Sequence, residues 1–181
     1  MHTGTGVTIR NARPEDGEGV AKVQIKAWQS AYAHIFPPEK LANLDADLGA
    51  LADRWRSNIL APERMPAFFV AAEPAGKVIG FAAAGKQLNQ NYPFETELQV
   101  LYLLPQYQRQ GIGTELMREV AAALFQAGYT SMMLWVLKEN WDSRVFYQKL
   151  GGQQVGESDY ERWGSTYEII AYGWKDLQLL L

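Results

Sequence analysis

The sequence predicts an α/β fold with a mostly antiparallel sheet, and two observations support this class. Apolar runs of strand length alternate along the chain with stretches in which apolar residues recur every three to four positions. Of the 181 residues, 48% are hydrophobic, which is enough for a sizeable core in one domain. We therefore expect a single domain over residues 7–181, preceded by a short flexible N-terminus at residues 1–6.

Prolines and a turn mark the element boundaries in the first half of the chain. Pro14 opens a helix, because proline is tolerated at the first helical position, and Pro37 with Pro38 breaks it. The segment 73–77 is typical of a hairpin turn between two apolar strands. In order, we expect a strand at 7–11, helices at about 14–31 and 47–60, strands at 68–72 and 78–84, and a loop at 87–94.

The second half contains the most regular stretch, residues 97–127. An apolar strand at 97–104 ends before Pro105, which has no N–H to donate, and a helix follows from Gly113 to about Ala127. Beyond it we expect a strand at 132–137, a helix at 140–150, strands near 153–157 and 166–174, and a turn at 160–165 between those two strands.

Composition excludes several classes of function. The chain has no cysteine, and neither His2 nor His34 has a metal-like partner nearby, so we expect no metal site. A net charge of −3 and a pI near 5.4 argue against a nucleic-acid partner. No run approaches the roughly 20 apolar residues of a membrane span, and no signal-peptide segment is present. We expect a cytoplasmic protein without membrane contact.

The segment between the strand and the helix, residues 108–114, has the features of an anion site. The first turn of a helix leaves backbone N–H groups unpaired, and the helix dipole adds partial positive charge there. Gly111 and Gly113 lack a Cβ, so the backbone can approach a pyrophosphate closely, and Arg109 adds charge. The segment is neither a Walker loop nor a complete dinucleotide-binding fingerprint.

Two stretches resemble one protein family. The string QRQGIG at 108–113 is similar to the Q/R-x-x-G-x-G/A signature of the GNAT superfamily of N-acetyltransferases, and residues 140–151 are similar to its N-x-x-A/S-x-x-F-Y-x-K-x-G helix. The resemblance covers about residues 7–174. It implies a GNAT fold, with a mixed, mostly antiparallel sheet of six to seven strands flanked by about four helices in the order β-α-α-β-β-β-α-β-α-β-β.

The resemblance also implies an activity. Members of the family transfer an acyl group, usually acetyl, from coenzyme A to an amine by direct attack in a ternary complex, which implies acetyl-CoA as co-substrate and a primary amine as acceptor. The acceptor here would be a small molecule or a peptide. The alternative is a catalytically inactive GNAT-like domain that binds coenzyme A as a sensor or assembly module.

The same resemblance implies where coenzyme A binds. The pantetheine arm would add to the strand through the backbone of Leu101 and Leu103, with a bulge near Leu103 supplying an N–H to the thioester carbonyl. Asn140 and Ser143 would contact the cofactor, although Asn140 could equally cap its helix. The pyrophosphate would rest on the turn, which is formed by Gln108, Arg109, Gln110, Gly111, Ile112, Gly113 and Thr114.

Two residues are catalytic candidates by this resemblance. Tyr147 matches the tyrosine that protonates the departing thiolate, and a phenol with a pKa of about 10 can do so without being ionised itself. Its alternative role is core packing. Glu97 matches a glutamate that deprotonates the acceptor amine, often through water. Glu97 could instead be a solvated surface residue, and Glu95 is a competitor on the same face of the strand.

Aromatic residues are dense in the segments expected to bound the acceptor. Trp28, Tyr32, Tyr92 and Trp163 could form a cage for an amine, because ring faces attract cations. The alternative is that these rings serve packing or a dimer surface. An apolar tail would be costly to expose, which favours either a homodimer partner or a tail folded back on the domain. The tail consists of Leu177, Leu179, Leu180 and Leu181.

Overall fold

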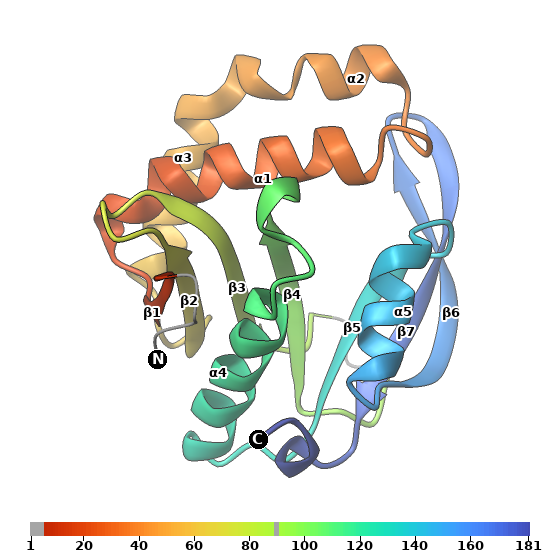
Figure 1. Cartoon of the computed structure of the whole chain (residues 1–181). Helices are drawn as coiled ribbons and strands as arrows, with labels where there is room; N and C mark the ends of the chain where they lie inside the picture. The colour runs from red at the N-terminus through yellow and green to blue at the C-terminus, as the bar shows by residue number, and fades with distance from the viewer. Residues whose placement is uncertain (1–5, 89–90) are drawn as a thin grey trace.

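The computed structural model describes residues 6–88 and 91–181. Seven strands in this part of the chain form one sheet of order β1-β2-β3-β4-β5-β7-β6, and helices lie on both of its sides (Figure 1). The elements are β1 Thr8–Asn11, α1 Gly17–Ala31, α2 Pro38–Ala42, α3 Leu48–Ile59, β2 Ala67–Ala72, β3 Val78–Lys86, β4 Thr96–Leu103, α4 Ile112–Gln126, β5 Met132–Leu137, α5 Trp141–Lys149, β6 Gln153–Arg162 and β7 Ser165–Trp174.

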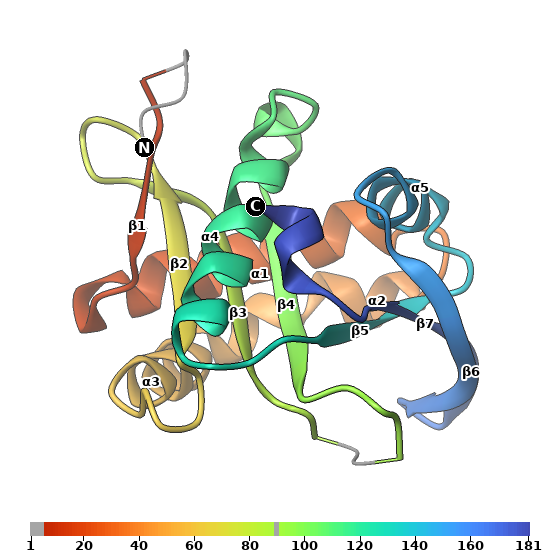
Figure 2. The same ribbon diagram turned by 90° about the horizontal axis from the view of Figure 1, so that it is seen from below.

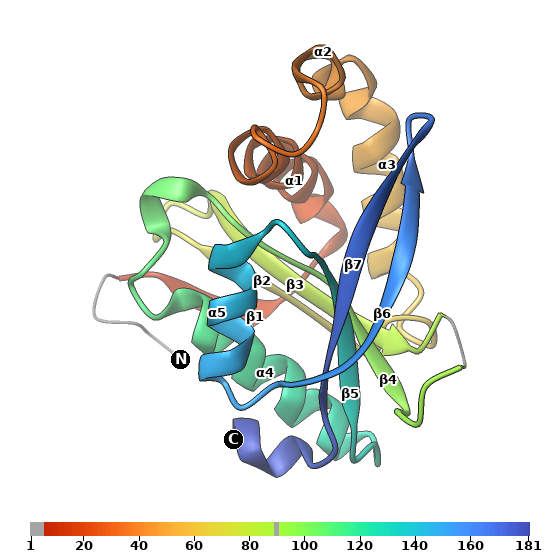
Figure 3. The same cartoon turned by 90° about the vertical axis from the view of Figure 1, so that its right-hand side faces the viewer.

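The helices divide between the two faces of the sheet. α1 and α3 pack on one face, whereas α4 and α5 lie on the other, as the views from below and from the side show (Figures 2 and 3). All neighbouring strands are antiparallel except β4 and β5, which are parallel. Within residues 6–88 and 91–181, we find no helix with the length and apolar character that a membrane crossing requires.

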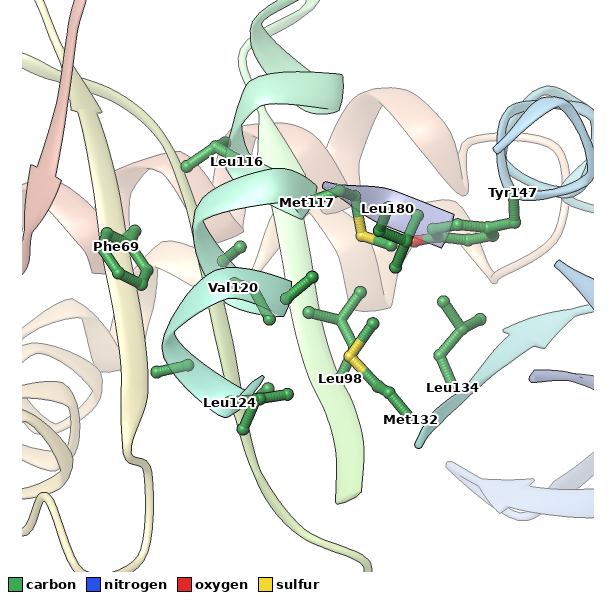
Figure 4. Close-up of a cluster of buried hydrophobic side chains, with 14 of the residues drawn as sticks. Phe69, Leu98, Leu116, Met117, Val120, Leu124, Met132, Leu134, Tyr147 and Leu180 are labelled. Atoms are coloured by element: carbon green, nitrogen blue, oxygen red, sulfur yellow. The ribbon is translucent and has the colours of Figure 1, made fainter. Parts of the chain in front are cut away.

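The larger core lies between α4 and the sheet. Leu116, Val120 and Leu124 recur on one face of α4 and are fully buried against Phe69 of β2 and Leu98 of β4 (Figure 4). Burying one such side chain contributes about 1.5–3 kcal/mol relative to leaving it exposed. The helical spacing that predicted α4 therefore also holds it on the sheet.

The element order and the fold class predicted from the sequence are confirmed. The turn predicted at 160–165 is present but shorter than predicted, because β6 continues to Arg162, which pairs with Ser165 at the start of β7. The chain reverses at Trp163 and Gly164, whose φ angles are 52° and 79°. Two successive residues with positive φ are typical of a two-residue hairpin turn. α2 is a further short helix that the sequence did not predict.

The C-terminal segment folds back on the domain. Leu177 and Leu180 of a short 3₁₀ helix are buried in the α4 core, while Leu179 and Leu181 are exposed. Of the two alternatives for the apolar tail, the structure therefore shows the folded-back one. The homodimer stays a prediction. The flexibility predicted for residues 1–6 falls on residues outside the described range, apart from Gly6.

Candidate active site

The two central strands of the sheet pair over only a short distance. The first two residues of β4 pair with the first two of β5, and beyond them the strands diverge into the V visible in Figure 1. A cleft of about 1100 Å³ opens there, lined by residues 98–103 of β4 and 134–137 of β5. In the described part of the chain, these two stretches present backbone groups to the cleft that no neighbouring strand pairs.

The cleft runs from one face of the sheet to the other. Its lining includes residues of α1 and α3 on one face, here termed the α1 half, and residues from the starts of α4 and α5 on the other, termed the α5 half. The bulge predicted near Leu103 is wrong in position, because Leu103 pairs with Gly80 in regular register. The register between β3 and β4 shifts instead at Gln99, which also lines the cleft.

No side chain caps the start of α4, which bounds the α5 half. Gly111 is the N-cap residue, with a φ of 84°, and a Cβ at this position would have nothing within 4 Å. The first N–H groups of α4 lack intrahelical partners, and Gly111 and Gly113 line the cleft. An uncapped helix start beside open space is the arrangement that binds anions.

Most residues of the predicted pyrophosphate turn border the cleft. Ile112 is fully buried in the core, so only its backbone can reach a ligand. Gln110 is outside the lining, and its Nε2 donates to the Gln106 carbonyl at 2.9 Å. The remaining residues of the turn line the cleft: Gln108, Arg109, Gly111, Gly113 and Thr114.

Side chains of the turn connect it to the neighbouring elements. Gln108 donates from Nε2 to the Leu103 carbonyl at 3.3 Å, which ties the turn to the end of β4. Arg109 has a φ of 59°, which is uncommon for a residue with a Cβ, and its Nη2 lies 3.3 Å from Oδ1 of Asp142 in α5. Because both partners of this ion pair are exposed, the pair contributes little to stability.

The start of α5 is closed by its own N-cap. Asn140 is buried, and its Oδ1 accepts a hydrogen bond from the Ser143 backbone N–H at 3.3 Å. The capping role considered for Asn140 is therefore confirmed. Asn140 and Ser143 both line the cleft, so their contact with coenzyme A stays a prediction that the geometry permits.

Tyr147 belongs both to the core and to the cleft lining. It projects from α5 toward α4 (Figure 4), is 7% exposed, and lies against Phe146, Tyr172 and Trp174. Burial raises the pKa of its hydroxyl well above the ordinary value, so the phenol stays protonated at neutral pH. Among the described residues, this hydroxyl has no hydrogen-bond partner. Core packing is thus shown, and the catalytic role stays a prediction.

Glu97 lies at the paired end of β4, outside the cleft lining. It is 7% exposed, so the solvated surface role considered for it is wrong. Because Leu98 packs in the core under α4, the alternation of side chains along a strand directs Glu97 to the opposite face, that of the α1 half. Burial raises the pKa of the Glu97 carboxyl, and a hydrogen bond at 3.0 Å from the Leu88 N–H partly opposes the rise.

Glu95, the alternative candidate for the general base, has a structural role instead. Its Oε2 accepts hydrogen bonds from the backbone N–H and the hydroxyl of Thr130, at 2.6 and 2.8 Å, and from the Ser131 N–H at 3.3 Å. These bonds lower the pKa of the Glu95 carboxyl. Glu95 therefore holds the loop between α4 and β5, and it does not line the cleft.

Aromatic rings bound the α1 half. Trp28 and Tyr32 line the cleft in an edge-to-face pair, with centroids 5.2 Å apart, and Trp163 packs against Trp28 at 6.4 Å. Tyr102 of β4 lines the same half. Burial raises the pKa of the Tyr32 hydroxyl and that of Tyr102, so both stay protonated at neutral pH. Three of the four rings predicted for the acceptor site are therefore neighbours.

Tyr92, the fourth predicted ring, lies elsewhere. It packs edge-on against Trp135, with centroids 5.2 Å apart, and close to Gly156 of β6, and it is not part of the cleft lining. The structure therefore does not bring Tyr92 together with Trp28, Tyr32 and Trp163.

The sequence analysis did not single out Tyr102, which lines the α1 half, or Arg162, which lies outside the lining and contacts Trp28. Strand alternation carries a signal for Tyr102, but the bulge at Gln99 shifts which residues share its face. Arg162 falls in the segment predicted as a turn, where no face can be assigned. Its strand position becomes clear only from the pairing of β6 with β7.

Comparison with known proteins now places the chain. The model of the acetyltransferase (GNAT) family matches residues 25–152, which contain β4, α4, β5 and α5. The chain belongs to this family. This GNAT protein is similar to the uncharacterized N-acetyltransferase YuaI of Bacillus subtilis, with 35% identity over 174 residues and 96% of each chain covered. It is therefore an acetyltransferase.

Solved structures show the same GNAT fold. The paia N-acetyltransferase of Thermoplasma acidophilum, solved in complex with coenzyme A, has a TM-score of 0.71 and 24% identity, with 91% of this chain and 97% of that chain covered. The yncA protein of Salmonella typhimurium, solved with its cofactor acetyl-CoA, has a TM-score of 0.64 and 19% identity, with 94% of each chain covered. At these identities the likeness concerns the fold alone.

Proposed function

We propose that the protein is an acetyl-CoA-dependent N-acetyltransferase that binds coenzyme A in the α5 half of the cleft and a primary amine in the α1 half. The observation that carries the proposal is the passage between β4 and β5, which joins an uncapped helix start on one face to aromatic rings on the other. Two substrates entering from opposite faces can meet there, as direct attack in a ternary complex requires. The acceptor is a small-molecule or peptide amine.

The α5 half fits the donor in two respects. The unpaired backbone groups of β4, including those of Leu101 and Leu103, can bond a pantetheine arm laid alongside as an additional strand. The open space at Gly111 and the free N–H groups of the α4 start can hold a pyrophosphate. When bound, the thioester supplies an activated acetyl group. The two solved relatives that contain coenzyme A or acetyl-CoA support this choice of donor.

Tyr147 is the general acid in this proposal. It lines the cleft, keeps its proton because burial raises its pKa, and has no hydrogen-bond partner in the described part of the chain. A protonated phenol that is free of other bonds can donate to a departing thiolate, whose ordinary pKa is about 8.5.

Glu97 is the general base in this proposal. A primary amine with a pKa of about 10.4 is neutral in roughly one molecule in a thousand at neutral pH, so a base increases the nucleophilic fraction. Burial raises the pKa of Glu97 toward the working range of such a base. Because Glu97 is outside the cleft lining, a water molecule must carry the proton between the amine and its carboxylate.

The test combines calorimetric titration with acetyl-CoA and a free-thiol release assay over a panel of primary amines. We expect one binding site per chain and thiol release that depends on the amine. Binding without release on any amine would contradict the transferase and favour a coenzyme A sensor. Absence of binding would contradict the placement of the pyrophosphate at Gly111.

A further inference from the structure

Arg162, the last residue of β6, is held against two indole rings of the α1 half. Its guanidinium carbon lies 4.7 Å from the ring centroid of Trp163 and 5.4 Å from that of Trp28. Trp28 lines the cleft, as does Tyr160, which precedes Arg162 by two positions and so shares its face of β6. The ring contacts and the strand pairing thus fix the Arg162 head beside the cleft lining.

Arg162 forms no ion pair with any residue that the structure describes. Its Nε is buried and has no hydrogen-bond partner there. The neighbouring Glu161 belongs to the other face of β6, and its carboxylate accepts a hydrogen bond from the Thr166 hydroxyl at 2.5 Å. Arg162 lies outside the cleft lining, but its guanidinium contacts Trp28, which lines it. A buried donor on a charged group is unfavourable when unpaired, so an anion bound beside Trp28 would supply the missing partner.

This geometry changes the chemistry expected of the aromatic rings. Ring faces attract cations, but Trp28 and Trp163 already contact a cation of the chain itself. A second cation would meet a like charge. Burial raises the pKa of Tyr102, and the positive charge of Arg162 is among the effects that oppose this rise. The charge of Arg162 therefore acts on a hydroxyl that lines the cleft.

No Asp or Glu is among the described residues that line the α1 half. Arg54 of α3 and His34 line this half, and Arg54 makes no ion pair with the described residues. The acidic residues of the lining, Glu139 and Asp142, flank the start of α5, and Glu97 is outside the lining. The described lining of the α1 half thus contains Arg54 and no Asp or Glu, although the chain has a net charge of −3 and the Glu97 side chain is directed to this face from outside the lining.

We propose that the acceptor is an amine that also carries a carboxylate, that Arg162 binds this carboxylate, and that Trp28 and Tyr32 contact the apolar part of the molecule. The proposal rests on the proposed function, because it names the acceptor class of the same cleft. Free amino acids and peptides with an acidic first residue share this chemistry. Polyamines and other purely cationic amines do not.

Thiol release with matched acceptors separates these classes. Each amino acid of a panel is compared with its amide, which keeps the amine and side chain but has no carboxylate, and glutamyl peptides are compared with glutaminyl peptides. We expect kcat/KM to be at least about tenfold higher for the carboxylate form in one of the two sets, because a hydrogen bond to a charged group contributes about 1.5–3 kcal/mol. A preference among the amino acids and their amides identifies a free amino acid as the acceptor. A preference among the glutamyl and glutaminyl peptides identifies a peptide with an acidic first residue.

Substitutions at Arg162 assign the preference to this residue. Arg162→Gln should reduce kcat/KM for the carboxylate acceptors to the level of their neutral counterparts, with the Kd for acetyl-CoA unchanged. Arg162→Lys keeps the positive charge and should retain part of the preference. Arg64→Gln is the matched control, because Arg64 is exposed and lies outside the cleft lining. We expect this control to behave as the parent.

The outcomes distinguish this inference from the proposed function. Thiol release that is equal for acids and amides, or that is fastest with polyamines, overturns the inference and leaves the transferase intact. A preference that persists in Arg162→Gln also overturns it. Binding of acetyl-CoA without release on any amine overturns the proposed function, and this inference with it. An unchanged Kd for acetyl-CoA shows that the Arg162 variant is folded, so that its loss of activity is not caused by unfolding.

Discussion

The starts of α4 and α5 border the same half of the cleft and are built in opposite ways. α5 begins at Asn140, whose side chain accepts a hydrogen bond from one of the first backbone N–H groups of the helix. α4 begins at Gly111, which has no side chain, a positive φ and open space where a Cβ would be. At a capped helix start, a side chain accepts a hydrogen bond from one of the first backbone N–H groups. At an uncapped start beside a cleft, these N–H groups can bind an anion instead. The contrast indicates which helix receives the ligand.

Gly111→Asp is the strongest way to break this comparison. The substitution puts a side chain and a negative charge at the proposed pyrophosphate site, so we expect no measurable binding of acetyl-CoA by calorimetry. Gly76→Asp is the matched control, because Gly76 has a φ of 85° and the same empty surroundings in the turn between β2 and β3. It carries equal strain and charge and should bind normally. Retained affinity in Gly111→Asp would refute the site.

On the α5 side, Tyr147→Phe tests the chemistry rather than the binding. Loss of a general acid should lower kcat by about 100-fold or more, with the Kd for acetyl-CoA changed less than about twofold. Tyr172→Phe serves as the control, because the Tyr172 hydroxyl accepts part-buried hydrogen bonds from Gln148 and Arg144 of α5. That variant should lose stability but keep its turnover per folded molecule. Unchanged kcat in Tyr147→Phe would remove its role as acid.

Asn140→Ala tests the capped start directly. Loss of an N-cap side chain costs about 1 kcal/mol, so we expect a lower midpoint of urea unfolding. Asn140→Asp keeps an oxygen acceptor and should recover most of the loss. If both variants also weaken acetyl-CoA binding to the same extent, Asn140 contacts the cofactor in addition to capping α5. If Asn140→Ala is as stable as the parent, the cap contributes nothing.

The smallest effect concerns Glu97, at the closed end of the cleft. Burial raises the pKa of the Glu97 carboxyl above the ordinary 4.5. At a pH between 4.5 and this raised pKa, Glu97 keeps its proton in the folded protein, whereas the unfolded chain has released it. The contribution of Glu97 to the free energy of unfolding is therefore most favourable below pH 4.5, and it is lost as the pH rises through the raised pKa. Glu97→Gln removes this dependence, while its amide oxygen can still accept from the Leu88 N–H.

The measurement is urea unfolding of parent and Glu97→Gln at about pH 4 and about pH 8. We expect the stability of the variant relative to the parent to rise between the two, since only the parent bears the buried charge at the higher pH. An identical difference at both pH values would show that Glu97 has an unshifted pKa.

Features set by neighbouring residues could be predicted from the sequence. The helical spacing of α4, the glycines at its start and the Asn140 cap depend on contacts within one or two turns, and all three are present in the structure. The length of β6 could not be predicted, because its exposed half contains too few apolar residues to mark a strand and is held by pairing with β7. Arg162 was missed for this reason.

Features that depend on strand register and on tertiary packing could not be predicted from the sequence. The irregularity at Gln99 rather than near Leu103 depends on how β3 and β4 align, which the residues of β4 alone do not specify. Tyr92 was assigned to the acceptor site from its aromatic character, but an aromatic side chain packs equally well in a core, and this one lies against Trp135. Its placement needed tertiary contacts.

The divergence of β4 and β5 has a consequence for how the protein exchanges hydrogen with solvent. About every second amide of residues 98–103 and 134–137 faces the cleft instead of a neighbouring strand. In deuterated water, those amides should exchange early, although β4 is the fourth of seven strands and belongs to the middle of the sheet. The slowest-exchanging amides should instead belong to β3, which is paired on both sides.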